Sequence, residues 1–179
     1  VVLACLAVLG GVAWAAGAAA RRALGELREQ IDAAADAVRE VAHGLSPRIL
    51  SEQGLGPALE ELTAGLPVET DVSWEGRTGS GAPSPSDEAS EDLYLIASEA
   101  ITNAMKHSGC SRIEVDVARQ DDVVQLTVRD DGAGGAAPTG RGILSMAARA
   151  RRLGGTFELV SPDGGPTTVM VRIPSGGPR

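Results

Sequence analysis

Apolar residues recur along the chain with two different periods, and these periods separate predicted helices from predicted strands. Between 22 and 45 the apolar positions alternate spacings of three and four: Leu24, Leu27, Ile31, Ala34, Val38, Val41 and Leu45. This is an a/d heptad seam, which a single helix cannot bury alone, so it requires a partner helix in the same chain or in another one. The pattern predicts a helical segment over 1–50, whose heptad helix at 22–45 is ended by Gly44 and Pro47.

The stretch 1–20 carries no charge and is followed by Arg21 and Arg22. Twenty uncharged residues are long enough to span a bilayer, and the two arginines would then place the rest of the chain in the cytoplasm. However, three glycines and many alanines make the stretch only weakly hydrophobic. Two interpretations stay open: a helix of a bundle, or a membrane contact that anchors an otherwise cytoplasmic protein.

The middle of the chain predicts a connecting helix and then a strand. A short helix follows Pro57 within a connecting segment at 51–67, with its leucines inward: Leu59, Leu62 and Leu66. Strict alternation of apolar and polar residues predicts a strand at 68–74. The run at 76–86, GRTGSGAPSPS, predicts an exposed connection because glycine, proline and serine dominate it.

The remainder predicts one α/β domain. A helix begins at Asp87 and carries an apolar stripe: Leu93, Ile96, Ala97, Ala100, Ile101 and Ala104. Two alternating strands (112–118 and 123–129), a helix closed by Gly154-Gly155 and a final hairpin (156–161 and 167–173) follow. This order predicts a two-layer α/β sandwich, a mixed sheet with helices on one face, over 68–174, and a short tail at 175–179.

Composition narrows the classes of partner. The net charge is −8 and no basic run occurs, so nucleic acid is a poor partner. The two cysteines share no metal-ligand spacing, which indicates ordinary reduced thiols. The chain has a single lysine, a single asparagine and two histidines, and three of these four residues lie within 103–107. Such a concentration of rare polar side chains indicates a functional site.

That cluster lies on the helix that begins at Asp87. Glu99, Asn103 and Lys106, with His107 beside them, are spaced to align on the face opposite the apolar stripe. A carboxylate, an amide oxygen and an ammonium in a row suit a hydrated Mg²⁺ with phosphates. The alternative is a solvated helix face with ordinary capping and ion pairs.

Three glycine-containing turns follow, each of which has an ordinary alternative. Asp130 to Gly134 (DDGAG) ends a strand, where an acid can accept a hydrogen bond from an exocyclic amine such as that of adenine. Gly140-Arg141-Gly142 enters a helix, whose N-terminal amides favour phosphate oxygens. Gly164-Gly165-Pro166-Thr167 leads into the last strand. Alone, the first and last are also typical of simple turns, and a single G-x-G before a helix is weak evidence.

The order of these four motifs resembles the nucleotide boxes of the GHKL (Bergerat) ATP-binding fold. EAITNAMKH, DDGAG, GRGILSM and GGPT are similar to its N, G1, G2 and closing boxes. That fold is shared by histidine kinases, Hsp90, MutL and type II topoisomerases. The stretch 38–56 resembles the second, HisKA_3-type dimerisation helix of two-component histidine kinases that pair with helix-turn-helix response regulators. The resemblance covers about 22–174.

The resemblance implies a role for each matching residue. Asn103 would coordinate Mg²⁺, Glu99 would position or deprotonate near the γ-phosphate, and Lys106 and His107 would meet phosphates. Asp130 would hold the adenine amine of ATP. Thr167 would support that contact through water, although Pro166 replaces a glycine usual in the last box. The lid around 135–139 would be shaped by four glycines: Gly132, Gly134, Gly140 and Gly142.

The sequence departs from this family at the phosphoacceptor. The family's acceptor histidine lies in the first dimerisation helix, in a pattern like E-L-H-D that does not occur here. His43 precedes Gly44 and is interpreted as a solvated or inter-helix residue. Collinearity with the family places Val1 shortly after the expected histidine. This favours a truncated chain in which 1–20 is the end of the first bundle helix.

The sequence therefore predicts the ATP-binding catalytic region of a sensor histidine kinase, a homodimer through 22–45 that signals to a response regulator. One alternative is an ATP-binding dimeric regulator, or a truncated pseudo-kinase, without its own phosphoacceptor. Another is a serine/threonine kinase of the anti-sigma-factor kind, which would not need the heptad seam. Phosphoryl transfer would rest on positioning and charge neutralisation around an in-line displacement.

Overall fold

The computed structural model describes residues 48–74 and 87–175. The described residues all belong to one compact unit. The predicted helices at 1–20 and 22–45 and the connection at 76–86 lie outside the described residues. Among the helices that are described, none has the length and apolar character needed to cross a bilayer.

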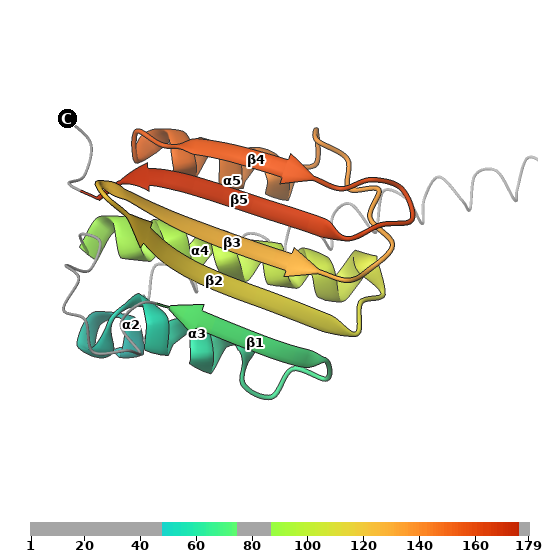
Figure 1. Ribbon diagram of the computed structural model, residues 1–179, viewed down its shortest axis with the longest axis horizontal. Coiled ribbons are helices and arrows are strands. Elements are labelled where there is room, and N and C mark those ends of the chain that lie inside the picture. Colours follow the sequence, from blue (N-terminus) through green and yellow to red (C-terminus); the bar gives the residue numbers. More distant parts are fainter. Residues whose placement is uncertain (1–47, 75–86, 176–179) are drawn as a thin grey trace, which may run out of the picture. The chain divides into compact units, whose positions relative to one another are not determined.

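A five-stranded sheet forms one layer of the unit (Figure 1). In spatial order its strands are β1 (Glu69–Trp74), β2 (Arg112–Gln120), β3 (Val123–Asp130), β5 (Thr167–Pro174) and β4 (Thr156–Val160). β1 pairs with β2 in parallel, and every other neighbouring pair is antiparallel. The predicted mixed sheet is confirmed.

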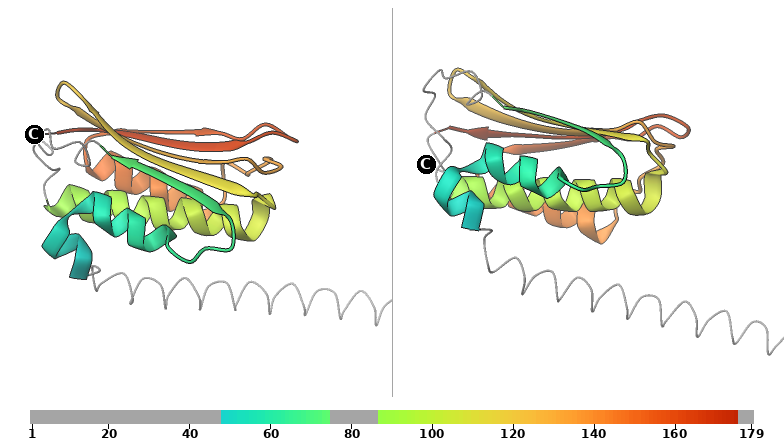
Figure 2. Two further views of the ribbon diagram at one scale, coloured as in Figure 1. Left: turned by 60° about the horizontal axis from the view of Figure 1, so that its bottom comes forward. Right: turned by 90° about the horizontal axis from the view of Figure 1, so that it is seen from below.

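The helices form the second layer and cover one face of the sheet (Figure 2). In the described part of the chain they are α2 (Arg48–Gln53), α3 (Leu55–Thr63), α4 (Asp87–Asn103), the π-helical turn η2 (Ala104–Ser108) and α5 (Arg141–Arg152). α5 begins at the same end of the domain as the C-terminus of α4, so the two helices run antiparallel (Figure 1). The two-layer α/β prediction is confirmed.

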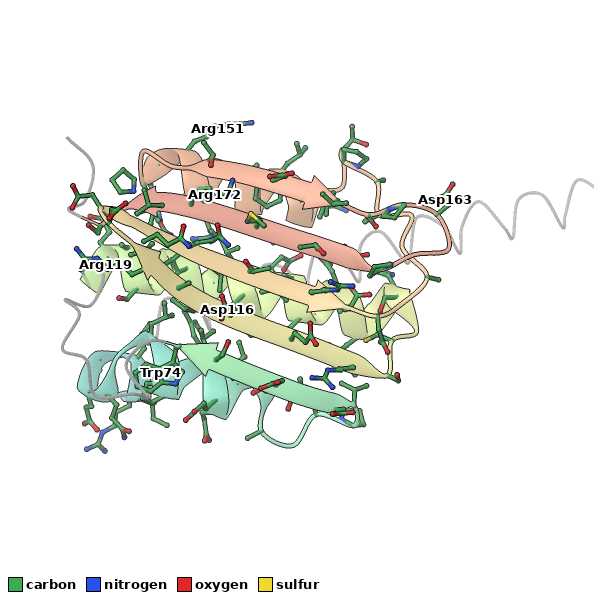
Figure 3. The ribbon with its side chains drawn as sticks, in the orientation of Figure 1. Trp74, Asp116, Arg119, Arg151, Asp163 and Arg172 are labelled. Atoms are coloured by element: carbon green, nitrogen blue, oxygen red, sulfur yellow. The ribbon has the colours of Figure 1, made fainter. Side chains whose placement is uncertain are left out.

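Alternation on the strands and the stripe on α4 fill the core between the layers. On β3 every second side chain is buried against the helices, namely Val124, Leu126 and Val128. Leu93, Ile96 and Ala97 of α4 are fully buried. The opposite sheet face is polar, and Figure 3 looks onto this face, with Asp116 on β2 and Arg172 on β5.

The region before β1 contains two helices, where the sequence predicted one after Pro57. α2 was missed, α3 begins before Pro57, and Leu66 lies beyond its end. Pro57 is tolerated because it lies in the first turn, where its missing N–H leaves no helical hydrogen bond unmade. Gly56 is required because any Cβ there would overlap the ring of Trp74. Both helices contribute buried residues to the same core as the sheet.

Candidate functional site

Asp130 is the last residue of the central strand β3, and its side chain is 5% exposed. It continues the alternation of β3, so it lies on the helix-covered side of the sheet. Its Oδ1 accepts a hydrogen bond from the backbone N–H of Gly132 at 2.9 Å. In the β3–β5 pairing its partner is Thr167. A buried carboxylate thus stands at the C-terminal end of β3, opposite the threonine that begins β5.

The loop after Asp130 lies against the C-terminal end of the α4 segment. The backbone N–H of Ala133 donates to the carbonyl of Ser108 at 2.9 Å. A Cβ on Gly132 would overlap the Ser108 side chain and lie 2.6 Å from its carbonyl oxygen. Ser108 closes the π-helical turn η2, a rare form that recurs at functional sites. Only a glycine at 132 permits this close approach.

The same loop also contacts the turn between β4 and β5. Gly164 N–H donates to the Ala133 carbonyl at 2.7 Å. The hydroxyl of Ser161 accepts from Ala136 N–H and lies 2.9 Å from the Thr167 hydroxyl. Figure 3 shows Asp163 at the tip of this turn, at the end of the domain where α4 ends. Three of the four predicted motifs therefore meet at one end of the sheet.

The fourth motif joins them through Gly142, in the first turn of α5. A Cβ on Gly142 would overlap Oε1 of Glu99 and lie 3.2 Å from Nδ2 of Asn103. Both side chains are half-buried, and in the described residues neither has a hydrogen bond or ion pair. The sequence placed them on a face opposite the apolar stripe, whereas they face the start of α5. A carboxylate and an amide without protein partners thus lie side by side next to a helix N-terminus.

Lys106 and His107 are exposed on η2, immediately after α4. The expected straight row of four side chains assumed α-helical spacing through position 107. The π-helical turn has wider i→i+5 bonding, which changes the direction of the residues after Asn103. Both side chains nevertheless stay at the end of the domain where Asp130 and Gly142 lie.

Gly140 immediately precedes α5 at the end of the predicted lid, which spans 135–139. Its N–H donates to the Ala137 carbonyl at 3.0 Å, and its own carbonyl accepts from Leu144 at 2.9 Å. Its φ is −58°, so the left-handed region is not required here. Gly134 is different, because its φ is +63° and a Cβ would overlap the Pro162 carbonyl oxygen.

Asp131 follows Asp130 in the sequence but has different surroundings. Its exposed carboxylate accepts hydrogen bonds from the hydroxyl and N–H of Ser111 and from the N–H of Arg112, at 2.6, 2.8 and 2.9 Å. These bonds, led by the Ser111 hydroxyl, lower the pKa of Asp131 from 3.8 to about 2. Asp131 therefore ties the β3 end to the start of β2.

The sequence analysis did not single out Ser161 or Ser108, which hold this end of the domain together. Ser161 closes the predicted final hairpin opposite Thr167, so a cross-strand hydroxyl pair was the available signal. Ser108 carried no such signal, because its contact with Gly132 joins residues that are distant in sequence.

Comparison with known proteins agrees with this fold. Residues 88–177 match the family described as histidine kinase-, DNA gyrase B- and HSP90-like ATPase. The nitrate/nitrite sensor protein NarX of Escherichia coli is 35% identical over 161 residues, which cover 84% of this chain and 26% of NarX. The sensor histidine kinase MctS of Rhizobium johnstonii is 28% identical over 158 residues, which cover 84% of this chain and 34% of MctS.

Solved structures give the same fold. The histidine kinase AdeS of Acinetobacter baumannii superimposes with a TM-score of 0.57 at 16% identity, covering 85% of this chain and 83% of that one. A blue-light activated histidine kinase of Erythrobacter litoralis gives 0.56 at 20% identity, covering 67% and 41%.

The chain belongs to the histidine kinase-, DNA gyrase B- and HSP90-like ATPase family. Within that family its curated relatives are two-component sensor histidine kinases, as the resemblance predicted. The chain spans about a quarter to a third of the length of these relatives. The HisKA_3 subfamily stays a prediction, because none of these matches tests it.

Proposed function

We propose that this chain is the ATP-binding catalytic region of a sensor histidine kinase. It would direct the γ-phosphate of Mg-ATP to a histidine of a dimerisation helix, for relay to an aspartate of a response regulator. The observation that carries this proposal is the meeting of four motifs at one end of the sheet. Asp130 and Thr167 lie on neighbouring strands, while Glu99 and Asn103 lie against Gly142.

The residues at this end fit a magnesium nucleotide. Glu99 and Asn103 offer oxygen atoms that no described protein group satisfies, and Mg²⁺ prefers such hard oxygen ligands. In the proposed site Asn103 holds the metal, and Glu99 positions the reacting groups or accepts a proton from the attacking side chain. When bound, the metal neutralises phosphate charge.

The other side chains bind the two ends of the nucleotide. Buried Asp130 accepts the exocyclic amine of adenine, with Thr167 supporting this contact through water. Lys106 and His107 meet the phosphates at the surface. Four glycines shape the loop that closes over them: Gly132, Gly134, Gly140 and Gly142. The dimer through 22–45, the response-regulator partner and the membrane contact through 1–20 belong to the proposal as predictions from sequence.

Calorimetric titration with Mg-ATP tests the site. The unchanged protein is expected to bind in the micromolar-to-millimolar range common for enzyme substrates. Asp130→Ala and Asn103→Ala are expected to lose binding, because each removes a group that contacts one end of the nucleotide. Asp131→Asn is the matched control, since Asp131 points to Ser111 and Arg112 instead. Unchanged affinity in both alanine variants would remove the site assignment.

A second function, an ATP-binding dimeric regulator, is favoured by the two histidines of the sequence, because neither lies in the acceptor pattern E-L-H-D. The chain has only His43 and His107, and His107 lies on η2 at the proposed site. Incubation with labelled ATP and a full-length kinase whose own ATP site is inactivated separates the two functions. Acid-labile phosphate on the partner's histidine supports a kinase, whereas bound ATP without transfer supports the regulator.

A further inference from the structure

Asp92 is a buried carboxylate on α4 that the proposed chemistry does not use. Its side chain is 1% exposed. Oδ1 accepts a hydrogen bond from Nη1 of Arg149 at 3.1 Å, and Oδ2 accepts one from Nε of Arg152 at 3.0 Å. Nη2 of Arg152 also contacts Oδ1. These bonds join α4 to the C-terminal half of α5.

We call Asp92, Arg149 and Arg152 the α4–α5 clamp. The same two helices carry the clamp and part of the proposed nucleotide site, at matching positions along their length. Glu99 follows Asp92 by seven residues on α4, and Arg149 follows Gly142 by seven residues on α5. Seven residues of α-helix make about two turns and rise about 10 Å, so each pair lies on one helix face. Because the helices are antiparallel, Asp92 meets Arg149 when Gly142 meets Glu99.

A helix transmits a displacement along its axis with little change in length. If the clamp loosened, α5 would shift along α4 or rotate, and Gly142 would change position relative to Glu99 and Asn103. The apolar contacts of α5 oppose such a shift less well than the clamp does, since a hydrophobic contact has no preferred direction. A carboxylate between two guanidinium groups fixes both distance and direction.

Arg149 and Arg152 hold Asp92 while they stay charged and partly exposed to water. The hydrogen bonds and charge of Asp92 raise the pKa of Arg152 further above its usual value. The Arg149 side chain is 27% exposed and that of Arg152 is 59% exposed, so each keeps part of its hydration while it holds the buried acid.

We infer that Asp92 is a positioning residue for the phosphate end of the nucleotide. Through Arg149 and Arg152 it sets the register of α5 along α4. It thereby places the Gly140–Gly142 helix start against Glu99 and Asn103. This inference rests on the proposed function, because it assigns the phosphates and magnesium to that helix start.

Asp92→Asn tests the inference, since it keeps the shape of the side chain and removes its charge. Mg-ATP binding is expected to weaken about tenfold, which is a loss of one decade in Kd. Adenosine, titrated by NMR chemical shifts, is expected to bind within about twofold of the unchanged protein, because its adenine contact at Asp130 is untouched. In the nucleotide-free protein the amide signals of Gly140 and Gly142 are expected to move.

A destabilised control separates positioning from stability. Leu59→Ala empties a fully buried position on α3, which does not belong to the α4–α5 clamp. It is expected to lower the midpoint of unfolding and to leave Mg-ATP affinity unchanged in the folded protein. Arg149→Lys is the milder second variant, because lysine keeps the positive charge and loses the guanidinium fork. It is expected to repeat the effect of Asp92→Asn in weaker form.

Different outcomes would contradict the positioning role of Asp92 and the proposed ATP-binding function. Mg-ATP binding at unchanged affinity in Asp92→Asn and Arg149→Lys overturns the positioning role. An equal loss for Mg-ATP and adenosine, matched by Leu59→Ala, overturns it as well, because the clamp would then act on stability alone. If the unchanged protein does not bind Mg-ATP, the proposed function itself fails, and the inference fails with it.

Discussion

The α4–α5 interface carries polar side chains at both ends, and the two ends differ in whether those side chains have partners. At one end Asp92 is buried and held by two arginines. At the other end Glu99 and Asn103 are half-buried, and within the described residues neither side chain has a partner. An unpaired polar group is costly to bury. The satisfied end therefore contributes to stability, while the unsatisfied end keeps its hydrogen-bonding capacity for a ligand.

The consecutive acids at the end of β3 show the same difference. Asp131 accepts three hydrogen bonds from the start of β2. Asp130 faces the helix layer and accepts one described bond, from Gly132. Sequence order does not separate the two acids, but their strand faces do.

Alanine substitutions of Asp92 and Glu99, at the two ends of the α4–α5 interface, should differ most in their effect on the free energy of unfolding. Asp92→Ala leaves Arg149 and Arg152 without their buried acceptor. Both arginines are partly exposed, so water replaces some of the loss, and the free energy of unfolding is expected to fall by about 1–3 kcal/mol. Urea denaturation of the nucleotide-free protein at neutral pH measures this change.

Glu99→Ala is the matched substitution at the open end. Since Glu99 has no described partner, the free energy of unfolding is expected to change by no more than about 0.5 kcal/mol. Equal losses in the two variants would show that both ends are structural, and the distinction between them would be wrong.

Much of this arrangement could be predicted from periodicity. The stripe on α4, the alternation on β2, β3 and β5, and the turns around the glycines are local signals, and they gave the mixed sheet with helices on one face. The position of Asp130 on the helix-covered side follows from the same alternation, since it is two residues beyond the buried Val128.

The parts that sequence missed depend on contacts between distant residues. Gly54, Gly56 and Pro57 have the composition of a turn, so the start of α3 before Pro57 was not predicted, and neither was the contact of Gly56 with Trp74. Asp92 looks like a surface acid on a helix, because its arginine partners are 57 and 60 residues away. The π-helical turn after Asn103 has no periodic signature of its own, so the row of site residues was expected to be straight.

Gly142→Ala tests the Glu99 end of the α4–α5 interface, and its expected effect on stability is smaller. The added methyl group meets the carboxylate of Glu99, which is the end of a flexible side chain and can rotate away. The free energy of unfolding is expected to change by less than about 0.5 kcal/mol. Mg-ATP affinity is expected to fall about three- to tenfold under the proposed function, because Glu99 is displaced.

Gly134→Ala is the contrasting control for Gly142→Ala. Its methyl group would meet the backbone carbonyl oxygens of Pro162 and Gly165, and its φ of +63° disfavours any side chain. A loss of more than about 1 kcal/mol in the free energy of unfolding is expected. If Gly142→Ala were as destabilising as Gly134→Ala, Glu99 would be fixed by the fold and not free to meet a ligand.

The smallest expected effect concerns Asp131 at low pH. Hydrogen bonds from Ser111 and Arg112 lower its pKa to about 2 in the folded protein, against 3.8 without them. A carboxylate with a lowered pKa contributes stability that is fully present above the unfolded value and is lost as pH falls from about 4 toward 2. The melting temperature of the unchanged protein should therefore fall more steeply over that range than that of Asp131→Asn. Because the side chain is exposed, the difference is small and calls for scanning calorimetry at closely spaced pH values. Parallel profiles would mean that these hydrogen bonds do not persist in solution, and the contrast between the two acids would then rest on the burial of Asp130 alone.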